Sequence, residues 1–138
     1  MKQPKVYLAH SVTNVAGTRS SLIELVTWLR IHGFAVTEPH PGLRQADLAA
    51  TTLRRVDDAD VLIADVSEYS HGVGFEIGYM YSLGKPVILI CRIQNQNRVS
   101  PFVLSVCPKI IFYETCSQLI SGIGEILQPS AMVSESAP

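Results

Sequence analysis

The fold is decided by residues 59–90, which read ADVLIADVSEYSHGVGFEIGYMYSLGKPVILI. Residues 60–66 are almost continuously apolar over the length of one strand, which is typical of a strand covered on both faces. A helical pattern follows over residues 73–84, and residues 86–93 predict the next strand. The large apolar residues spaced four apart in the helix are expected to form its buried stripe: Phe75, Tyr79 and Leu83. Together these elements predict a strand–helix–strand unit of a parallel sheet.

The rest of the chain continues the same alternation. Further strands are predicted at residues 5–12, 34–39 and 109–114, and further helices at residues 20–33, 46–59 and 117–128. This rhythm predicts one α/β domain over residues 1–128, Rossmann- or flavodoxin-like, with a five-stranded, mainly parallel sheet and helices on both faces. Residues 129–138 are small and polar without periodicity, so we expect a disordered tail there.

Composition and charge exclude several classes of partner. The 138 residues include 11 Lys and Arg and 12 Asp and Glu, and the net charge of −1 gives no electrostatic reason to bind a nucleic acid polymer or an anionic membrane. The start lacks the apolar core of a signal peptide, and no apolar stretch reaches the ~20 residues that span a bilayer. The three cysteines form neither an even set nor a C-x-x-C pair, which fits a reducing compartment. We therefore expect a soluble, cytoplasmic protein.

Three loops of the predicted sheet are expected to open on one rim, because the carboxyl ends of parallel strands lie at the same edge. These loops contain His10 and Ser11, residues 70–76, and residues 92–100. We expect them to converge on one cleft. The four histidines lie in different elements and the sequence has no H-x-x-x-H motif or Cys/His cluster, so it predicts neither a metal nor a cofactor.

The loop with the most candidate residues is 70–76, which reads SHGVGFE. Gly72 and Gly74 would let a ligand approach backbone amides, and the helix N-terminus adds a partial positive charge suited to an anion. Glu76 is a candidate catalytic carboxylate, although a glutamate in a first helical turn more often only complements the helix dipole. The spacing G-x-G-x-x-x-G has one residue too many for a dinucleotide fingerprint.

Residues 59–90 resemble the central signature of the nucleoside 2-deoxyribosyltransferase superfamily, and most closely that of the Rcl-type 2'-deoxynucleoside 5'-monophosphate N-glycosidases. The resemblance runs from Val6 to about Ser100 and rests on GVGFEIG followed by LGKP. It implies that Glu76 is a nucleophile that attacks the anomeric carbon and forms a glycosyl ester. It also implies that Tyr7 neighbours this glutamate, whereas without the resemblance Tyr7 is equally an ordinary strand aromatic.

The same resemblance implies a pocket for the 5'-phosphate of a nucleotide. The matching positions are Ser70, Gly72, Ser11 and, from a neighbouring subunit, Ser100. Transferases that act on free nucleosides carry an aspartate where Ser70 stands, and a carboxylate there would repel phosphate. The resemblance therefore implies a nucleoside 5'-monophosphate as substrate. It also implies a homodimer or higher homo-oligomer whose active sites are shared between subunits.

Several positions depart from the family pattern. Thr52 stands where the family has an acidic residue that assists the leaving base, and a threonine is no general acid near neutral pH. Nearby carboxylates could replace it if the helix is shifted: Asp47, Asp57 and Asp58. The first loop has His10, Thr13 and Asn14 in place of glycine, arginine and glycine. His10 or Arg19 could supply the missing contact to phosphate or base, although a histidine at a strand end is more often structural.

Three hypotheses follow from these residues. The first is hydrolysis of a nucleoside 5'-monophosphate to free base and sugar 5-phosphate through a Glu76 intermediate. The second is base exchange between deoxynucleosides, which Ser70 argues against. The third is a nucleotide-binding module that kept the pocket and lost turnover when the acidic residue became Thr52.

Overall fold

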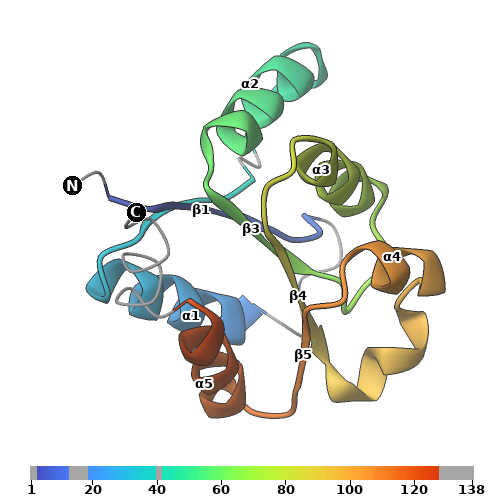
Figure 1. Ribbon diagram of the computed structural model, residues 1–138. Helices are drawn as coiled ribbons and strands as arrows, with labels where there is room; N and C mark the ends of the chain where they lie inside the picture. Colours follow the sequence, from blue (N-terminus) through green and yellow to red (C-terminus); the bar gives the residue numbers. More distant parts are fainter. Residues whose placement is uncertain (1–2, 13–18, 40–41, 128–138) are drawn as a thin grey trace.

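The protein has an α/β fold built on a five-stranded sheet, and the computed structural model describes residues 3–12, 19–39 and 42–127 (Figure 1). The strands are β1 (Lys5–Ala9), β2 (Ala35–Thr37), β3 (Val61–Asp65), β4 (Val87–Arg92) and β5 (Ile110–Tyr113). The helices are α1 (Arg19–Ile31), α2 (Gln45–Asp58), α3 (His71–Ser82), α4 (Pro101–Val106), α5 (Cys116–Ile126) and the 3-10 helix η1 (Ile93–Arg98). The strand order is β2-β1-β3-β4-β5, and every neighbouring pair is parallel. The predicted flavodoxin-like fold is confirmed, with a sheet that is parallel throughout.

Alternate residues of each strand face opposite layers of helices. In β1, Val6 and Leu8 join a core with α1 and α5, whereas Tyr7 and Ala9 join a second core with α2 and α3. Figure 1 shows the same division, with α1 and α5 on one side of the sheet and α2, α3 and α4 on the other. The period of two along a strand therefore aims the Tyr7 side chain at the layer that contains α3.

The strand order also determines where a crevice can form. The chain places β2 on one side of β1 and all later strands on the other, so the direction of winding reverses between β1 and β3. At such a reversal the connections leave neighbouring strands in opposite directions and open a crevice at the carboxyl ends of the strands. The loops after β1 and β3 border this crevice.

Helix α3 buries a different stripe from the predicted one. Phe75 is 63% exposed and Leu83 is 40% exposed. The buried residues of α3 are Val73, Glu76, Ile77 and Met80. Apolar residues occur almost all round this helix, so spacing alone allows more than one buried stripe, and packing of the shorter side chains against the sheet selects one. As a result, Glu76 lies on the face that packs inward.

Two further boundaries differ from the prediction. Strand β1 ends at Ala9, and the segment 92–100, predicted as a loop, contains η1 and the start of α4. Ser100 caps α4, because its side chain accepts a hydrogen bond from the Val103 amide, and Pro101 follows at the first helical position. The predicted tail at 129–138 lies outside the described residues. Within the described ranges, no helix combines the length and hydropathy needed to cross a bilayer.

Candidate active site

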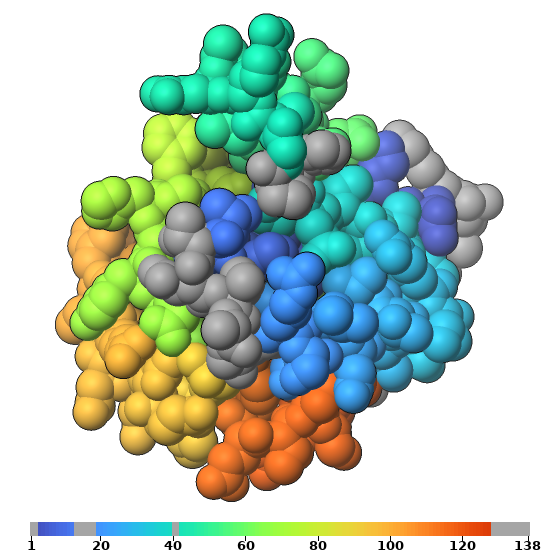
Figure 2. Space-filling view, turned by 180° about the vertical axis from the view of Figure 1, so that it is seen from behind, coloured from blue at the N-terminus to red at the C-terminus, as the bar shows by residue number. Residues whose placement is uncertain are grey.

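A cleft of about 540 Å³ lies where the sheet changes its winding direction, between α2 and α3. It is lined by Tyr7, His10, Ser11, Val12, Pro39, Leu43, Leu48, Ala49, Thr52, Leu53, Ser70, Gly72, Val73, Phe75 and Glu76. Figure 2 shows this face of the molecule, with the loop after β1 in blue between α2 and the start of α3. Most of the candidate site residues predicted from the sequence therefore share one cleft.

Glu76 and Tyr7 meet in the interior of the cleft. Glu76 is 7% exposed and Tyr7 is fully buried, and a side-chain hydrogen bond joins the phenol to the carboxylate. Burial raises the pKa of Glu76 above its usual value, while the Tyr7 hydrogen bond and the charge of His10 oppose the increase. Burial and the neighbouring carboxylate likewise raise the pKa of Tyr7 well above its usual value. Tyr7 therefore remains a hydrogen-bond donor to Glu76 at any physiological pH.

His10 lies at the wall of the cleft and is held on two sides. Its Nδ1 is 3.1 Å from the carbonyl oxygen of Ser11, and its Nε2 is 3.5 Å from Oε1 of Glu38. A carbonyl only accepts hydrogen bonds, so Nδ1 carries a proton and Nε2 is the atom that gains or loses one. His10 and Glu38 also line an adjoining hollow of about 290 Å³, together with Arg19.

The N-terminus of α3 forms another side of the cleft. Ser70 is the N-cap of this helix, and its Oγ accepts a hydrogen bond from the Val73 amide at 3.3 Å. The hydroxyl proton of Ser70 is not used in that bond. Gly72 also lines the cleft, and a side chain added there would come within 3.9 Å of the Ser70 hydroxyl. Ser11, which is 6% exposed, faces this helix end from the loop after β1.

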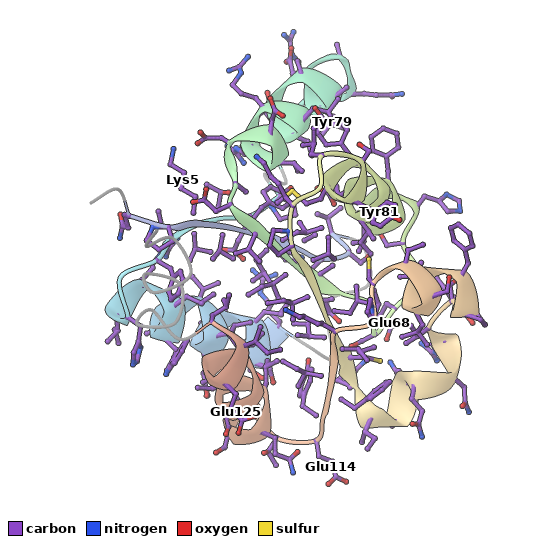
Figure 3. All side chains as sticks on the ribbon, viewed as in Figure 1. Lys5, Glu68, Tyr79, Tyr81, Glu114 and Glu125 are labelled. Atoms are coloured by element: carbon purple, nitrogen blue, oxygen red, sulfur yellow. The ribbon has the colours of Figure 1, made fainter. Side chains whose placement is uncertain are left out.

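The α2 wall of the cleft carries Thr52 between apolar residues. None of the aspartates considered as its replacement lines the cleft. Asp47 pairs with Arg44 at 3.0 Å, and Asp58 pairs with Lys5 at 2.7 Å. Asp57 accepts a 3.5 Å hydrogen bond from Tyr79, and Figure 3 shows Tyr79 on the side of α3 nearest α2. The helix is not shifted in the way that would bring one of them to the position of Thr52.

Two predicted site residues lie outside this cleft. Gly74 and Ser100 instead border a separate hollow of about 110 Å³ between α3 and α4. The prediction that residues 92–100 converge on the same cleft as the other two loops is therefore wrong within one chain. Helix η1 and the α4 cap direct this segment to the far side of α3, where Ser70 and Val73 separate the two spaces. Thr13 and Asn14 lie outside the described residues.

Residues 6–119 match the family model described as nucleoside 2-deoxyribosyltransferase. The chain belongs to this family. The match includes both sides of the cleft, from Tyr7 on β1 through Thr52 on α2 to Glu76 on α3.

Relatives within the family are named for hydrolysis of nucleotides. A protein of Thermofilum pendens with the provisional name 2'-deoxynucleoside 5'-phosphate N-hydrolase 1 is 28% identical, and the alignment covers 91% of this chain and 96% of that protein. The 5-hydroxymethyl-dUMP N-hydrolase of Rattus norvegicus is 37% identical over 51 residues, which are 37% of this chain and 31% of that one.

Solved structures share the fold at lower identity. The CMP N-glycosidase of Clostridium botulinum superposes with a TM-score of 0.71 at 18% identity, covering 89% of this chain and 99% of that chain. A 2-deoxyribosyltransferase of Bacillus psychrosaccharolyticus superposes with a TM-score of 0.65 at 20% identity, covering 84% and 90%.

The sequence motifs did not reveal two polar features near the loops after the strands, one in the hollow that adjoins the cleft and one in the hollow between α3 and α4. One is Glu38, which follows β2 directly and approaches His10 from 28 positions away in the chain. Its position at the carboxyl end of a strand adjacent to β1 is the signal that could have found it.

The other feature is Glu68, which lies after β3 and before Ser70. It accepts from Arg92 at 2.9 Å, from Arg98 at 2.6 Å and from Asn95 at 3.2 Å. Figure 3 shows Glu68 beside the segment formed by η1 and α4. No sequence motif marks this arrangement, because the partners come from a different loop. Across the described ranges, no group of three His, Cys, Asp or Glu side chains is arranged to hold a metal ion.

Proposed function

We propose that the protein hydrolyses the N-glycosidic bond of a nucleoside 5'-monophosphate, releasing the free base and the sugar 5-phosphate. The observation that carries this proposal is the buried Glu76 carboxylate, hydrogen-bonded to Tyr7 inside a cleft large enough for a nucleotide. The names of the relatives support the same reaction. A carboxylate held beside a sugar ring stabilises the positive charge that develops at the anomeric carbon when the base departs.

In the proposed reaction, a carboxylate oxygen of Glu76 bonds to the anomeric carbon while the carbon–nitrogen bond breaks. Water then attacks the glycosyl ester and frees the sugar phosphate. Tyr7 keeps the carboxylate oriented, since a buried phenol with a strongly raised pKa donates its proton to Glu76 and does not lose it. Burial of Glu76 also makes its negative charge more effective, because little water competes for it.

The phosphate would lie at the N-terminus of α3. The Ser70 hydroxyl, the amides of the first helical turn and the uncrowded backbone at Gly72 are donors suited to an anion. Among the described residues that line the cleft there is no lysine or arginine, so hydroxyl and amide donors would hold the phosphate. A hydroxyl in place of a carboxylate at Ser70 favours a nucleotide over a free nucleoside and therefore hydrolysis over base exchange between nucleosides.

The base would lie against the α2 wall. This wall presents apolar side chains with Thr52 as its polar group: Leu43, Leu48, Ala49 and Leu53. Phe75, from α3, closes the cleft from the other side. Such a wall would hold a base by shape and stacking, because it has few donors or acceptors for the edges of the base.

The active site is proposed to be shared between two copies of the chain. In one chain Ser100 lies beyond α3 and does not reach the cleft, so it would serve the cleft of a partner. Large apolar side chains are exposed on the same side of the molecule, with Tyr81 of α3 at 55% and Phe102 of α4 at 74%. An interface through α3 and α4 would cover them.

The first test is a panel of ribo- and deoxyribonucleoside 5'-monophosphates and the matching nucleosides, with free base measured by chromatography. We expect release from monophosphates and none from nucleosides. Glu76→Ala and Glu76→Gln should lower the rate by about 10³-fold or more, since they remove the nucleophile. Glu76→Gln should melt no lower than the wild type, because glutamine keeps an acceptor for Tyr7 and removes a charge that burial disfavours.

Unchanged turnover by both Glu76 variants would overturn the mechanism. Transfer of the sugar to an added free base, with nucleosides as donors, would establish base exchange instead. If no base is released while a monophosphate raises the melting temperature, the protein is a nucleotide-binding module, and Thr52→Asp would then be the variant expected to gain turnover.

A further inference from the structure

The proposed reaction needs a proton for the departing base, and the cleft offers few sources. Among the described residues that line it, the titratable side chains are Tyr7, His10 and Glu76. Glu76 must be ionised to attack, and burial makes Tyr7 a very weak acid. Thr52 cannot donate a proton near neutral pH. Among the described lining residues, the imidazole of His10 is therefore the group suited to give and take a proton there.

Both ring nitrogens of His10 lie near an oxygen atom, one on each side of the ring. Nδ1 donates to the Ser11 carbonyl, which fixes the ring and leaves Nε2 as the exchanging atom. Glu38 lies 3.5 Å from Nε2, close enough to stabilise a positive charge but longer than a usual charge-assisted hydrogen bond. The side chain of His10 is 16% exposed, which limits competition from bulk water.

Glu38 itself is held in place by the neighbouring helix. Arg55 of α2 donates from Nη1 to the backbone carbonyl of Glu38 at 2.9 Å. His10 lies on the boundary between the cleft and the adjoining hollow, because it lines both spaces together with Val12 and Pro39, whereas Glu38 lines the hollow. A base in the cleft can therefore meet the His10 ring while Glu38 stays in the hollow.

We propose that His10 is the general acid that protonates the leaving base, and that Glu38, 3.5 Å from Nε2, is the residue that positions its ring. This rests on the proposed function. As Glu76 forms the bond to the anomeric carbon, the carbon–nitrogen bond breaks, its electron pair moves into the base, and the Nε2 proton passes to the base. In the second step neutral His10 takes a proton from the attacking water, the ester bond breaks, and Glu76 and His10 return to their starting states.

Charged and titratable groups face His10 from every neighbouring element. They are Glu76 of α3, Glu38 after β2, Tyr7 of β1, Arg55 of α2 and Arg19 of α1. Of these groups, Glu38 lies at ion-pair distance from Nε2, at 3.5 Å. A carboxylate beside an imidazole stabilises its charged form, so a Glu38 variant tests whether this contact acts on the catalytic proton.

The test uses two leaving groups that differ in their need for a proton. Nucleotide bases require one, whereas 4-nitrophenolate leaves without one, so the second substrate is the 4-nitrophenyl glycoside of the same sugar 5-phosphate. We expect His10→Gln to lower kcat/KM on the best nucleotide by about 10²–10⁴-fold, and kcat/KM on the 4-nitrophenyl substrate by less than about tenfold. The comparison uses kcat/KM because this quantity reports formation of the glycosyl ester and excludes its hydrolysis, in which His10 acts for both substrates. Glu38→Gln should move the alkaline limb of the kcat profile to lower pH while leaving activity at acidic pH nearly intact.

The matched control is His32→Gln, because His32 is exposed at the end of α1 and bonds only its own helix through Trp28. This variant should retain wild-type rates on both substrates. Equal losses by His10→Gln on the two substrates would overturn the general-acid role, as would no loss on either. An alkaline limb that Glu38→Gln leaves unmoved would remove Glu38 from the mechanism. A wild type that releases neither base nor nitrophenol would instead refute the proposed function itself.

Discussion

At the scale of single residues, the site depends on the balance between burial and charge at Glu76. Burial disfavours the ionised carboxylate and so raises the pKa of Glu76, whereas the hydrogen bond from Tyr7 stabilises the ionised form and lowers this pKa. In the proposed mechanism the Glu76 carboxylate attacks only when it has lost its proton, so a raised pKa should place the acidic limb of activity above the pH at which an exposed glutamate ionises. Tyr7 is therefore expected to determine the pH at which the enzyme begins to work.

Tyr7→Phe tests this expectation. Phenylalanine fills the same buried position but donates no hydrogen bond, so the pKa of Glu76 should rise further and the acidic limb of kcat/KM should move to higher pH. We expect activity at neutral pH to fall by about 10–10³-fold, and stability to change by roughly 1–2 kcal/mol for the lost buried hydrogen bond. The pH dependence of kcat/KM and thermal unfolding measure the two effects. An acidic limb at its wild-type position would show that Tyr7 does not act through Glu76.

At the scale of elements, the loop after β3 is braced against the segment after β4. Glu68 holds Arg92, Asn95 and Arg98, while Ser67 accepts from the Arg92 amide at 2.9 Å. The side chain of Glu68 is 23% exposed, so these charge-assisted bonds are partly shielded from water. The brace fixes the chain two residues before Ser70, and hence the N-terminus of α3 where we place the phosphate.

Glu68→Gln should loosen this brace without changing the shape of the side chain. We expect a loss of about 1–3 kcal/mol in the free energy of unfolding, and a KM for the monophosphate that rises more than kcat falls. Denaturant unfolding and steady-state kinetics measure these quantities. Glu125→Gln, at an exposed position of α5, is the control and should change neither. A Glu68→Gln variant with wild-type stability and KM would refute the link between the brace and the phosphate.

At the scale of the whole molecule, the proposed site takes Ser100 from a second chain. Ser100 borders the hollow beyond α3, and the exposed aromatics Tyr81 and Phe102 lie on the helices around it. A symmetric dimer through this surface would bury both aromatics and bring the Ser100 of each chain toward the cleft of the other. The proposed dimer thus makes activity a property of two chains.

Mixing two inactive variants tests whether sites are shared. Ser100→Asp keeps a good helix cap but places a negative charge beside the phosphate, so this variant and Glu76→Gln should each be nearly inactive alone. Co-refolded together, they form mixed dimers in which one site combines an intact Glu76 with an intact Ser100. Activity should recover to about a quarter of the wild-type level if chains pair at random in twofold dimers. No recovery, with dimers present by light scattering, would show that Ser100 does not serve a partner's cleft.

The alternation of apolar runs along the sequence determined the fold, because each buried strand needs a connecting helix to cover it. Alternation along β1 also separates Tyr7 from Val6 and Leu8, whereas the family followed from the motif GVGFEIG and the LGKP after it. Local spacing could not choose which stripe α3 buries, because this helix is apolar almost all round. Only packing against the sheet decided that Phe75 is exposed and Glu76 is buried.

In the candidate site, too, some features could be predicted from the sequence and others depended on the tertiary structure. The helix start at Ser70 and the turn around Gly72 could be predicted from the local sequence, because caps and turns depend on neighbours in the chain. The pairing of Glu38 with His10, the bracing of Glu68 by two arginines, and the separation of Ser100 from the cleft depend on residues brought together across the sheet. Such contacts leave no periodic trace in the sequence, since strand order and helix placement create them. The sequence by itself determined which elements form and which residue types border a ligand; the tertiary structure alone decided which of them share a space, because burial and distance arise only when the chain is packed.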